Sequence, residues 1–312
     1  MRLEAQNLIE LVLRSDGGLS GAVARKVSSY FTSVGEFLAC TREQLEGLRS
    51  ASGLPLRIDG GDIEKVLRVK STGILSEGLP LVDNYIRGLA RDFTRRQVEN
   101  ISALSLDSLN INPLLIRSLN LKAPLEVLEF NVSAAVSRSI VTSMGYFVQN
   151  LLEVTSDDVE KVRSGWDLVK HGPDGKNHWI QVKSGPNDMD KDQIIYWLQE
   201  IQRVESKGDR GYIGMTYGKR DNSTVTLSLM RTYLTDMELR TLIGRELWDF
   251  LSGDNKFHER LFDSLRISAS KILGSRSIQE EIGKKINDLL LEFTKRYGDG
   301  EQGLARYIQS IF

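Results

Sequence analysis

The sequence predicts a mixed α/β (α+β) protein in which helices flank a mixed central sheet, preceded by an all-helical N-terminal domain. Two observations support this prediction. Residues 1–125 and 233–312 place apolar side chains at helical spacing. Between these two regions, short apolar segments alternate with turns rich in glycine and proline, as the strands of a sheet do. We therefore expect residues 1–125 to form a helical domain and residues 126–312 to hold the sheet and the C-terminal helices.

A hairpin defines the sheet most clearly. A short apolar segment that carries Asp167 leads into the turn HGPDGKN, which holds two glycines and a proline. The returning segment, HWIQVK, has Gln181 and Lys183 two positions apart, so both side chains lie on one face of a strand. The hairpin therefore brings a carboxylate, an amide and an ammonium group together.

These three side chains suit the hydrolysis of a phosphodiester. Asp167 offers the carboxylate oxygens that Mg²⁺ prefers, and Gln181 offers an amide oxygen to the same ion. Lys183 is placed to orient a water molecule or to neutralise the negative charge that develops on the phosphoryl group. The alternative interpretation is an ordinary exposed hairpin with a surface aspartate and a surface lysine.

The same residues carry a family resemblance. Asp167, thirteen further residues and then Gln181-Val182-Lys183 resemble the core motif of the PD-(D/E)XK nucleases. The extension KSGPN after Val182, with Met144-Gly145 upstream, resembles a subset of type II restriction endonucleases. The resemblance covers about residues 130–232. It implies the restriction-endonuclease fold and Mg²⁺-dependent hydrolysis of double-stranded DNA, with 5′-phosphate and 3′-hydroxyl ends.

The sequence departs from the family motif at two positions. Trp166 replaces the proline, and Gln181 replaces the second acidic residue, which removes one negative charge from the metal site. Some relatives with glutamine at this position take a second carboxylate from the preceding helix. Glu153 is the only carboxylate in the predicted helix 137–153, so the resemblance implies this role for it. The alternative is that Glu153 is a solvated residue of the last helical turn.

Candidate DNA contacts follow the lysine of the motif. The acidic segment DMDKD starts a new helix, because acidic side chains favour the first helical turn. Ser184, Asn187, Lys191 and Gln193 lie where this helix begins, and we expect them to contact DNA. An enzyme that cuts both strands of a symmetric site is often a two-fold dimer, so we expect a homodimer.

The N-terminal region resembles helix-hairpin-helix DNA-binding units. Glycines at 18–21 and at 60–61 each precede a helix, and such turns can direct backbone N–H groups at a phosphate. Nearby basic side chains would add positive charge: Arg25, Lys26, Arg57, Lys65 and Arg68. A helical bundle whose ends are capped by glycine explains the same pattern.

Several further elements follow from periodicity and turn residues. We expect a long helix over 132–153 that begins with Ser133 as its cap. Strands are expected at 211–218 and 224–230, followed by one amphipathic helix over 234–251.

Composition limits the class of protein. The 312 residues carry a formal net charge of −1, which is mild evidence against nucleic-acid binding but permits a local basic surface. Cys40 is the only cysteine, which suits a reducing cytoplasm. The leading hypothesis, which rests on the resemblance, is a type II restriction endonuclease. The alternatives are a structure-specific repair or recombination nuclease, and an inactive DNA-binding protein on the same fold.

Overall fold

The computed structural model describes residues 4–49, 58–76, 78–162 and 165–311. The chain forms two compact units, each built from two separate segments: Met1–Leu89 with Phe147–Arg266, and Ala90–Tyr146 with Ile267–Phe312. The boundaries between the units fall inside three helices: α6 (Leu81–Ala103), α8 (Pro124–Leu152) and α13 (Phe257–Leu273). The units therefore differ from the division into 1–125 and 126–312 that the sequence predicts.

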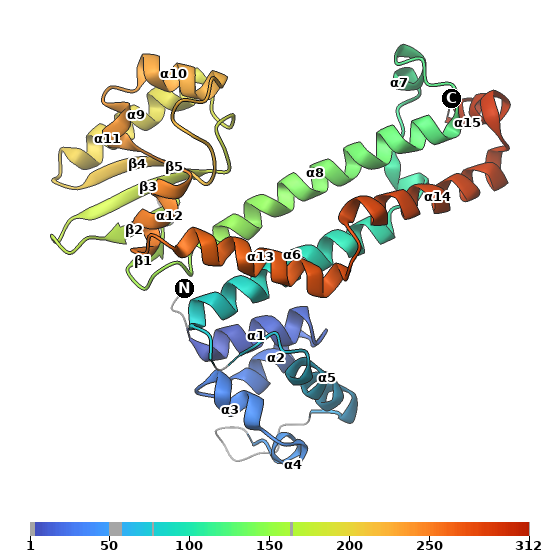
Figure 1. Ribbon diagram of the computed structural model, residues 1–312. Coiled ribbons are helices and arrows are strands. Elements are labelled where there is room, and N and C mark those ends of the chain that lie inside the picture. Colours follow the sequence, from blue (N-terminus) through green and yellow to red (C-terminus); the bar gives the residue numbers. More distant parts are fainter. Residues whose placement is uncertain (1–3, 50–57, 77, 163–164, 312) are drawn as a thin grey trace. The chain divides into compact units, whose positions relative to one another are not determined.

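A five-stranded mixed sheet lies in the first unit (Figure 1). Its strands, in their order across the sheet, are β1 (Val159–Lys161), β2 (Leu168–His171), β3 (Asn177–Lys183), β4 (Arg210–Met215) and β5 (Thr241–Ile243). β1 and β3 each pair with β2 in antiparallel fashion, and β3, β4 and β5 are parallel. The predicted hairpin is therefore confirmed as β2–β3, with its turn at residues 172–176.

Helices cover both faces of this sheet (Figure 1). On one face, α9 (Lys191–Glu205) and α10 (Val225–Tyr233) share an apolar core with β4. A Cβ atom on Gly211 would lie 3.0 Å from the α9 backbone, so glycine permits this close packing. On the other face, the side chain of Leu247 in α12 (Arg245–Ser252) packs over Gly214.

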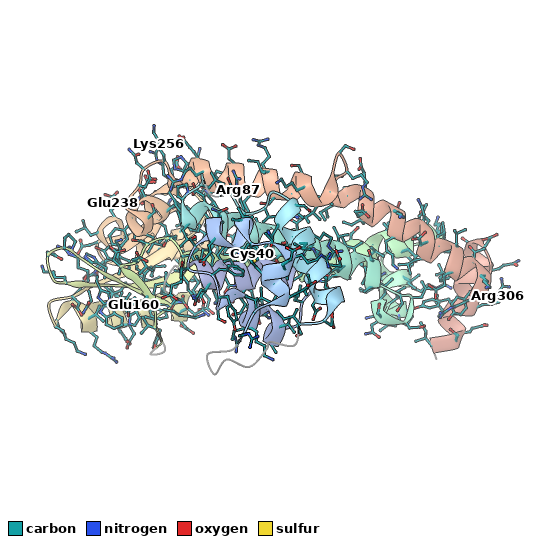
Figure 2. The ribbon with its side chains drawn as sticks, turned by 90° about the horizontal axis from the view of Figure 1, so that it is seen from below. Cys40, Arg87, Glu160, Glu238, Lys256 and Arg306 are labelled. Carbon is teal, nitrogen blue, oxygen red and sulfur yellow. The ribbon has the colours of Figure 1, made fainter. Side chains whose placement is uncertain are left out.

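The N-terminal helices also belong to the first unit: α1 (Ala5–Ser15), α2 (Gly21–Ser28), α3 (Val34–Ala39), α4 (Arg42–Glu46) and α5 (Gly60–Ser71). Thr41 caps α4 in a capping box with Gln44. Buried Cys40 follows α3 and lies among these helices (Figure 2).

The expected helix-hairpin-helix elements can be located within this region. Gly18 lies between α1 and α2 with a φ of +66°, and Gly60 opens α5. The basic side chains meet different partners: Arg25 pairs with Glu10, Lys65 with Asp62, and Arg68 donates to the carbonyl of Gly17. Lys26 is exposed, and Arg57 lies outside the described residues. DNA binding by this region stays a prediction.

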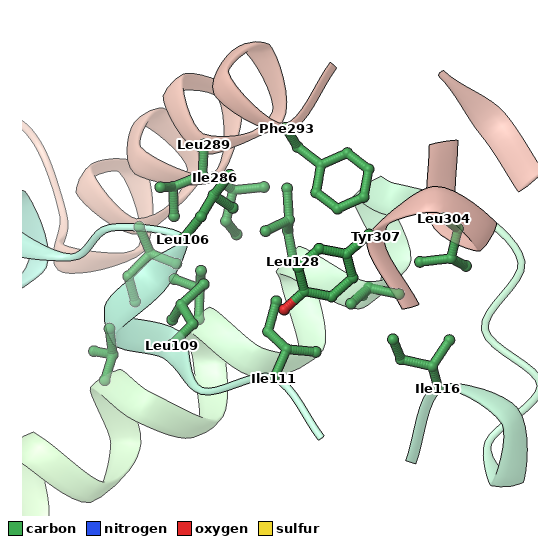
Figure 3. Packing of buried hydrophobic residues seen from close by; sticks show 14 of the residues in the cluster. Leu106, Leu109, Ile111, Ile116, Leu128, Ile286, Leu289, Phe293, Leu304 and Tyr307 are labelled. Carbon is green, nitrogen blue, oxygen red and sulfur yellow. The ribbon is translucent and has the colours of Figure 1, made fainter. Parts of the chain in front are cut away.

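The described residues of the second unit form helices and connecting turns, without a strand. Its core is formed by apolar side chains of α8, α14 (Ile278–Tyr297) and α15 (Gly300–Ile311), with η1 (Asp107–Leu109) and α7 (Pro113–Ser118) beside them. Figure 3 shows Leu128 of α8 facing Phe293 of α14 and Tyr307 of α15. The rings of Phe293 and Tyr307 are 5.3 Å apart between centroids, within the range of favourable aromatic pairs.

Three predicted elements are wrong. Ser133 does not begin a helix, because α8 starts at Pro124, a residue suited to the first helical turn, and continues without a break. Residues 224–230 form most of α10 and not a strand. Thr224 accepts a hydrogen bond from the Leu227 N–H as the helix cap, and the buried positions follow helical spacing.

The predicted helix over 234–251 is divided into three elements. It contains α11 (Met237–Arg240), the edge strand β5 and α12. Gly244 separates β5 from α12 with a φ of +59°, and a Cβ atom there would lie 2.7 Å from the carbonyl oxygen of Gly218. The apolar run therefore enters the sheet where glycine permits the turn.

Candidate active site

Asp167 is held in place by its own backbone. It lies directly before β2, where its N–H donates to Ile180 O at 3.2 Å and its carbonyl accepts from the Val162 N–H at 3.1 Å. These two bonds tie the residue to β3 on one side and to the end of β1 on the other. The position of the carboxylate is therefore determined by the sheet.

The Asp167 carboxylate meets Gln181 and Val182 of β3. Its Oδ2 accepts from Gln181 Nε2 at 2.6 Å and from the Val182 backbone N–H at 2.7 Å. Burial raises the pKa of Asp167 above its ordinary value. The Val182 N–H, the charges of Lys183 and Lys161 and the Gln181 amide oppose that rise. Burial therefore disfavours the charged carboxylate by more than the two hydrogen bonds and the two lysines together favour it.

Gln181 has an unsatisfied oxygen. The side chain is only 8% exposed, and its Oε1 is buried without a hydrogen-bond partner among the described residues. A buried acceptor in this state costs about 1–3 kcal/mol. A hard cation beside Asp167 would use that oxygen, so the donor set present here fits Mg²⁺.

Lys183 ends β3 and is half-buried. It shares a strand face with Gln181, as the spacing predicts. Its carbonyl accepts from the Thr216 N–H at 3.2 Å, which links it to the end of the parallel strand β4. The lysine and the amide therefore both project from a paired, central strand.

Glu153 directly follows α8 and carries an ion pair. Its Oε1 lies 2.8 Å from Nζ of Lys161, and its side chain is 14% exposed. Lys161 ends β1, the strand whose Glu160 is labelled in Figure 2. Sequence reasoning missed Lys161, because a strand of three residues with one buried position has no recognisable period.

The four expected DNA contacts are exposed. Ser184 and Asn187 lie on the turn between β3 and α9. Nζ of Lys191 lies 5.0 Å from the ring centroid of Tyr233. The Gln193 side chain accepts from the Asp190 N–H within the capping box of α9. These residues share one turn and one helix N-terminus, next to Lys183.

The described residues hold no cluster of three or more acidic, histidine or cysteine side chains that would form a metal site by themselves. The donors assembled here are instead one carboxylate and one amide oxygen, with Glu153 as a further candidate. Within the described part of the chain, no helix is long and apolar enough to cross a membrane.

A search of curated proteins finds no match. The family model for the type II restriction endonuclease EcoO109I matches residues 81–272, which is more than half of the chain. This region contains the sheet, α9 and every residue of the candidate active site. The mixed α/β fold and the type II restriction endonuclease family predicted from the sequence are therefore confirmed, and the chain belongs to the EcoO109I family of type II restriction endonucleases.

Proposed function

We propose that this protein is a site-specific endonuclease that hydrolyses double-stranded DNA with Mg²⁺. The observation that carries the proposal is the buried, unsatisfied Oε1 of Gln181 beside the Asp167 carboxylate, with Lys183 on the same strand face. Membership of a restriction endonuclease family supports this reading of the site. The arrangement corresponds to a PD-(D/E)XK site in which glutamine takes the place of the second acid.

Asp167 and Gln181 would hold the metal ion, with the backbone carbonyl of Val182 as a further ligand. Glu153 is the candidate for the second carboxylate. When bound, Mg²⁺ supplies positive charge that polarises the scissile phosphate. The Val182 N–H and the Gln181 amide orient the Asp167 carboxylate, because both donate to the same oxygen, Oδ2. The other oxygen, Oδ1, is then the one to face the ion.

Lys183 would act on the attacking water and on the charge that develops at phosphorus. Its ammonium approaches the site from the carboxyl end of β3, where the exposed turn begins. A fixed cation at that position stabilises the transition state without reorganisation of solvent. Ser184, Asn187, Lys191 and Gln193 would contact the DNA on the adjoining surface, by bonds to phosphates or base edges.

The proposal extends to the oligomeric state and the cellular location of the enzyme. Cutting both strands of a symmetric site calls for two active sites, so we propose a homodimer. A chain with a single cysteine needs no oxidising compartment, and we place its activity in the cytoplasm.

The test is digestion of a large unmethylated phage DNA with Mg²⁺, beside a digestion that contains EDTA. We expect discrete fragments that disappear with EDTA, and the fragment ends then identify the recognition site. A smear, or cleavage confined to flaps and junctions in a panel of short substrates, would instead indicate a nonspecific or structure-specific nuclease. Intact DNA with retained binding would indicate an inactive DNA-binding protein.

A further inference from the structure

Lys161 and Glu153 form an ion pair next to the proposed metal site. The separation of 2.8 Å is that of a charge-assisted hydrogen bond, and Glu153 is largely buried while Lys161 is 55% exposed. The residue after Lys161, Val162, donates its N–H to the carbonyl of Asp167. At the end of β1, the Lys161 side chain therefore contacts Glu153, and the next residue, Val162, is bonded to the backbone of Asp167.

The charge of Lys161 also acts on Asp167. Burial is the largest influence on the pKa of Asp167 and raises it, and the ammonium groups of Lys183 and Lys161 are among the influences that lower it. One ammonium is thus paired with Glu153 and stabilises the anionic form of Asp167. Asp167 and Glu153 are the two carboxylates proposed above as ligands of the metal ion.

Another lysine on the neighbouring strand shows a different arrangement. Lys170 on β2 is 12% exposed and donates to Asp158 at 2.7 Å and to the carbonyl of Leu251 at 3.0 Å. That ammonium is enclosed and held by two partners. The Lys161 side chain is 55% exposed, and it pairs with the single carboxylate of Glu153, so it can move into solvent when another cation takes its place beside Glu153.

We infer that Lys161 is a resident counter-ion of the metal site, which neutralises Glu153 when the cation is absent and is displaced from it when the cation binds. Lys161 is a positioning residue, because it acts through Glu153. The inference rests on the proposed function, since it concerns the same metal site. It implies that the protein holds its own cation in competition with Mg²⁺ and thereby weakens metal binding.

The test is calorimetric titration of the full chain with Mn²⁺, a probe for Mg²⁺ sites, in the absence of DNA. Lys161→Met should bind Mn²⁺ about tenfold more tightly than the wild type, because the cation then no longer has to displace an ammonium group from the Glu153 carboxylate. Lys161→Arg should behave as the wild type. Lys176→Met is the matched control, since Lys176 is an exposed lysine on the turn at the far end of the same hairpin. It should leave the affinity unchanged.

A double-mutant cycle separates competition from a merely structural effect. In a Glu153→Gln background, Lys161→Met should lose most of its tenfold effect, because the lysine no longer shields a carboxylate. Circular dichroism of each variant verifies that it is folded. Equal or weaker Mn²⁺ binding by Lys161→Met, or an undiminished effect in the Glu153→Gln background, would overturn the inference.

The metal site and the counter-ion can fail separately. If Asp167→Asn abolishes Mn²⁺ binding while Lys161→Met leaves it unchanged, the metal site stands and the counter-ion is wrong. If Asp167→Asn binds Mn²⁺ as the wild type does, or if neither wild type nor Lys161→Met binds it, the metal site and the counter-ion are both wrong.

Discussion

Replacing Gln181 by glutamate introduces the second acid of the PD-(D/E)XK motif that the sequence resembles, and it should make the fold depend on metal. In the wild type, Gln181 Nε2 donates to Asp167 Oδ2 at 2.6 Å, and Gln181 is 8% exposed. A hydrogen bond to a charged group contributes about 1.5–3 kcal/mol. Gln181→Glu removes this bond and places two buried carboxylates in contact, which adds like-charge repulsion. We expect the metal-free variant to lose about 2–4 kcal/mol of unfolding free energy at neutral pH.

Urea unfolding followed by tryptophan fluorescence measures this loss at the site. Trp166 directly precedes Asp167, Trp179 lies two residues before Gln181, and the two ring centroids are 6.4 Å apart. The lost stability should return in acid, because one proton shared between the two carboxyl groups relieves the repulsion. It should also return with Mg²⁺ at neutral pH. Gln199→Glu, on the exposed face of α9, is the matched control and should show neither response.

Two results would refute this reasoning. An unchanged urea midpoint without metal would mean that the Gln181–Asp167 bond contributes nothing to the fold. A loss that Mg²⁺ does not restore, in a variant that recovers in acid, would mean that the two side chains do not share a cation.

Three further predictions concern Asp167, the packing of α9 and the turn after β3. Because burial raises the pKa of Asp167 in the fold above its ordinary 3.8, its carboxyl group favours the metal-free fold at low pH, and this contribution is lost as the pH rises through that raised value. Asp167→Asn should remove this pH dependence from the urea midpoint, and an identical profile in both proteins would contradict the assignment. Gly211→Ala should cost about 1–3 kcal/mol in urea unfolding because α9 must move, whereas Gly283→Ala, which meets open space on α14, should be neutral or stabilising. Thr224→Ala removes the cap of α10 and a 2.7 Å bond to the carbonyl of Pro186, so it should cost about 1–2 kcal/mol in urea unfolding, with Thr224→Ser close to wild type.

The hairpin could be predicted from sequence because its signals are local. A turn with two glycines and a proline lies between two apolar segments, and residues two apart in a strand share a face. Asp167, Gln181 and Lys183 were found in this way, and the structure brings Asp167 and Gln181 into direct contact. The helix after the hairpin could also be predicted from local signals, because its acidic N-terminus forms a capping box.

The remaining features depend on the folded chain. The segment TVTLSLM alternates like a strand, yet its apolar residues also satisfy helical spacing, and the cap formed by Thr224 decides for the helix. Strands β1 and β5 have three residues each, too few to show a period. Lys161 belongs to one of them, so its pair with Glu153 could not be anticipated. The unsatisfied oxygen of Gln181 depends on burial, which no pattern of letters records.

The most direct test of the central claim is a single-turnover cleavage rate measured with Mg²⁺ on a DNA fragment that carries the mapped site. Wild type, Asp167→Ala and Lys183→Ala should be compared at protein concentrations where binding, measured with Ca²⁺, is complete for all three. We expect both variants to bind the fragment and to cleave it at a rate at least about a thousandfold lower than that of the wild type. Cleavage by Asp167→Ala at the wild-type rate would contradict the claim that this hairpin is the active site.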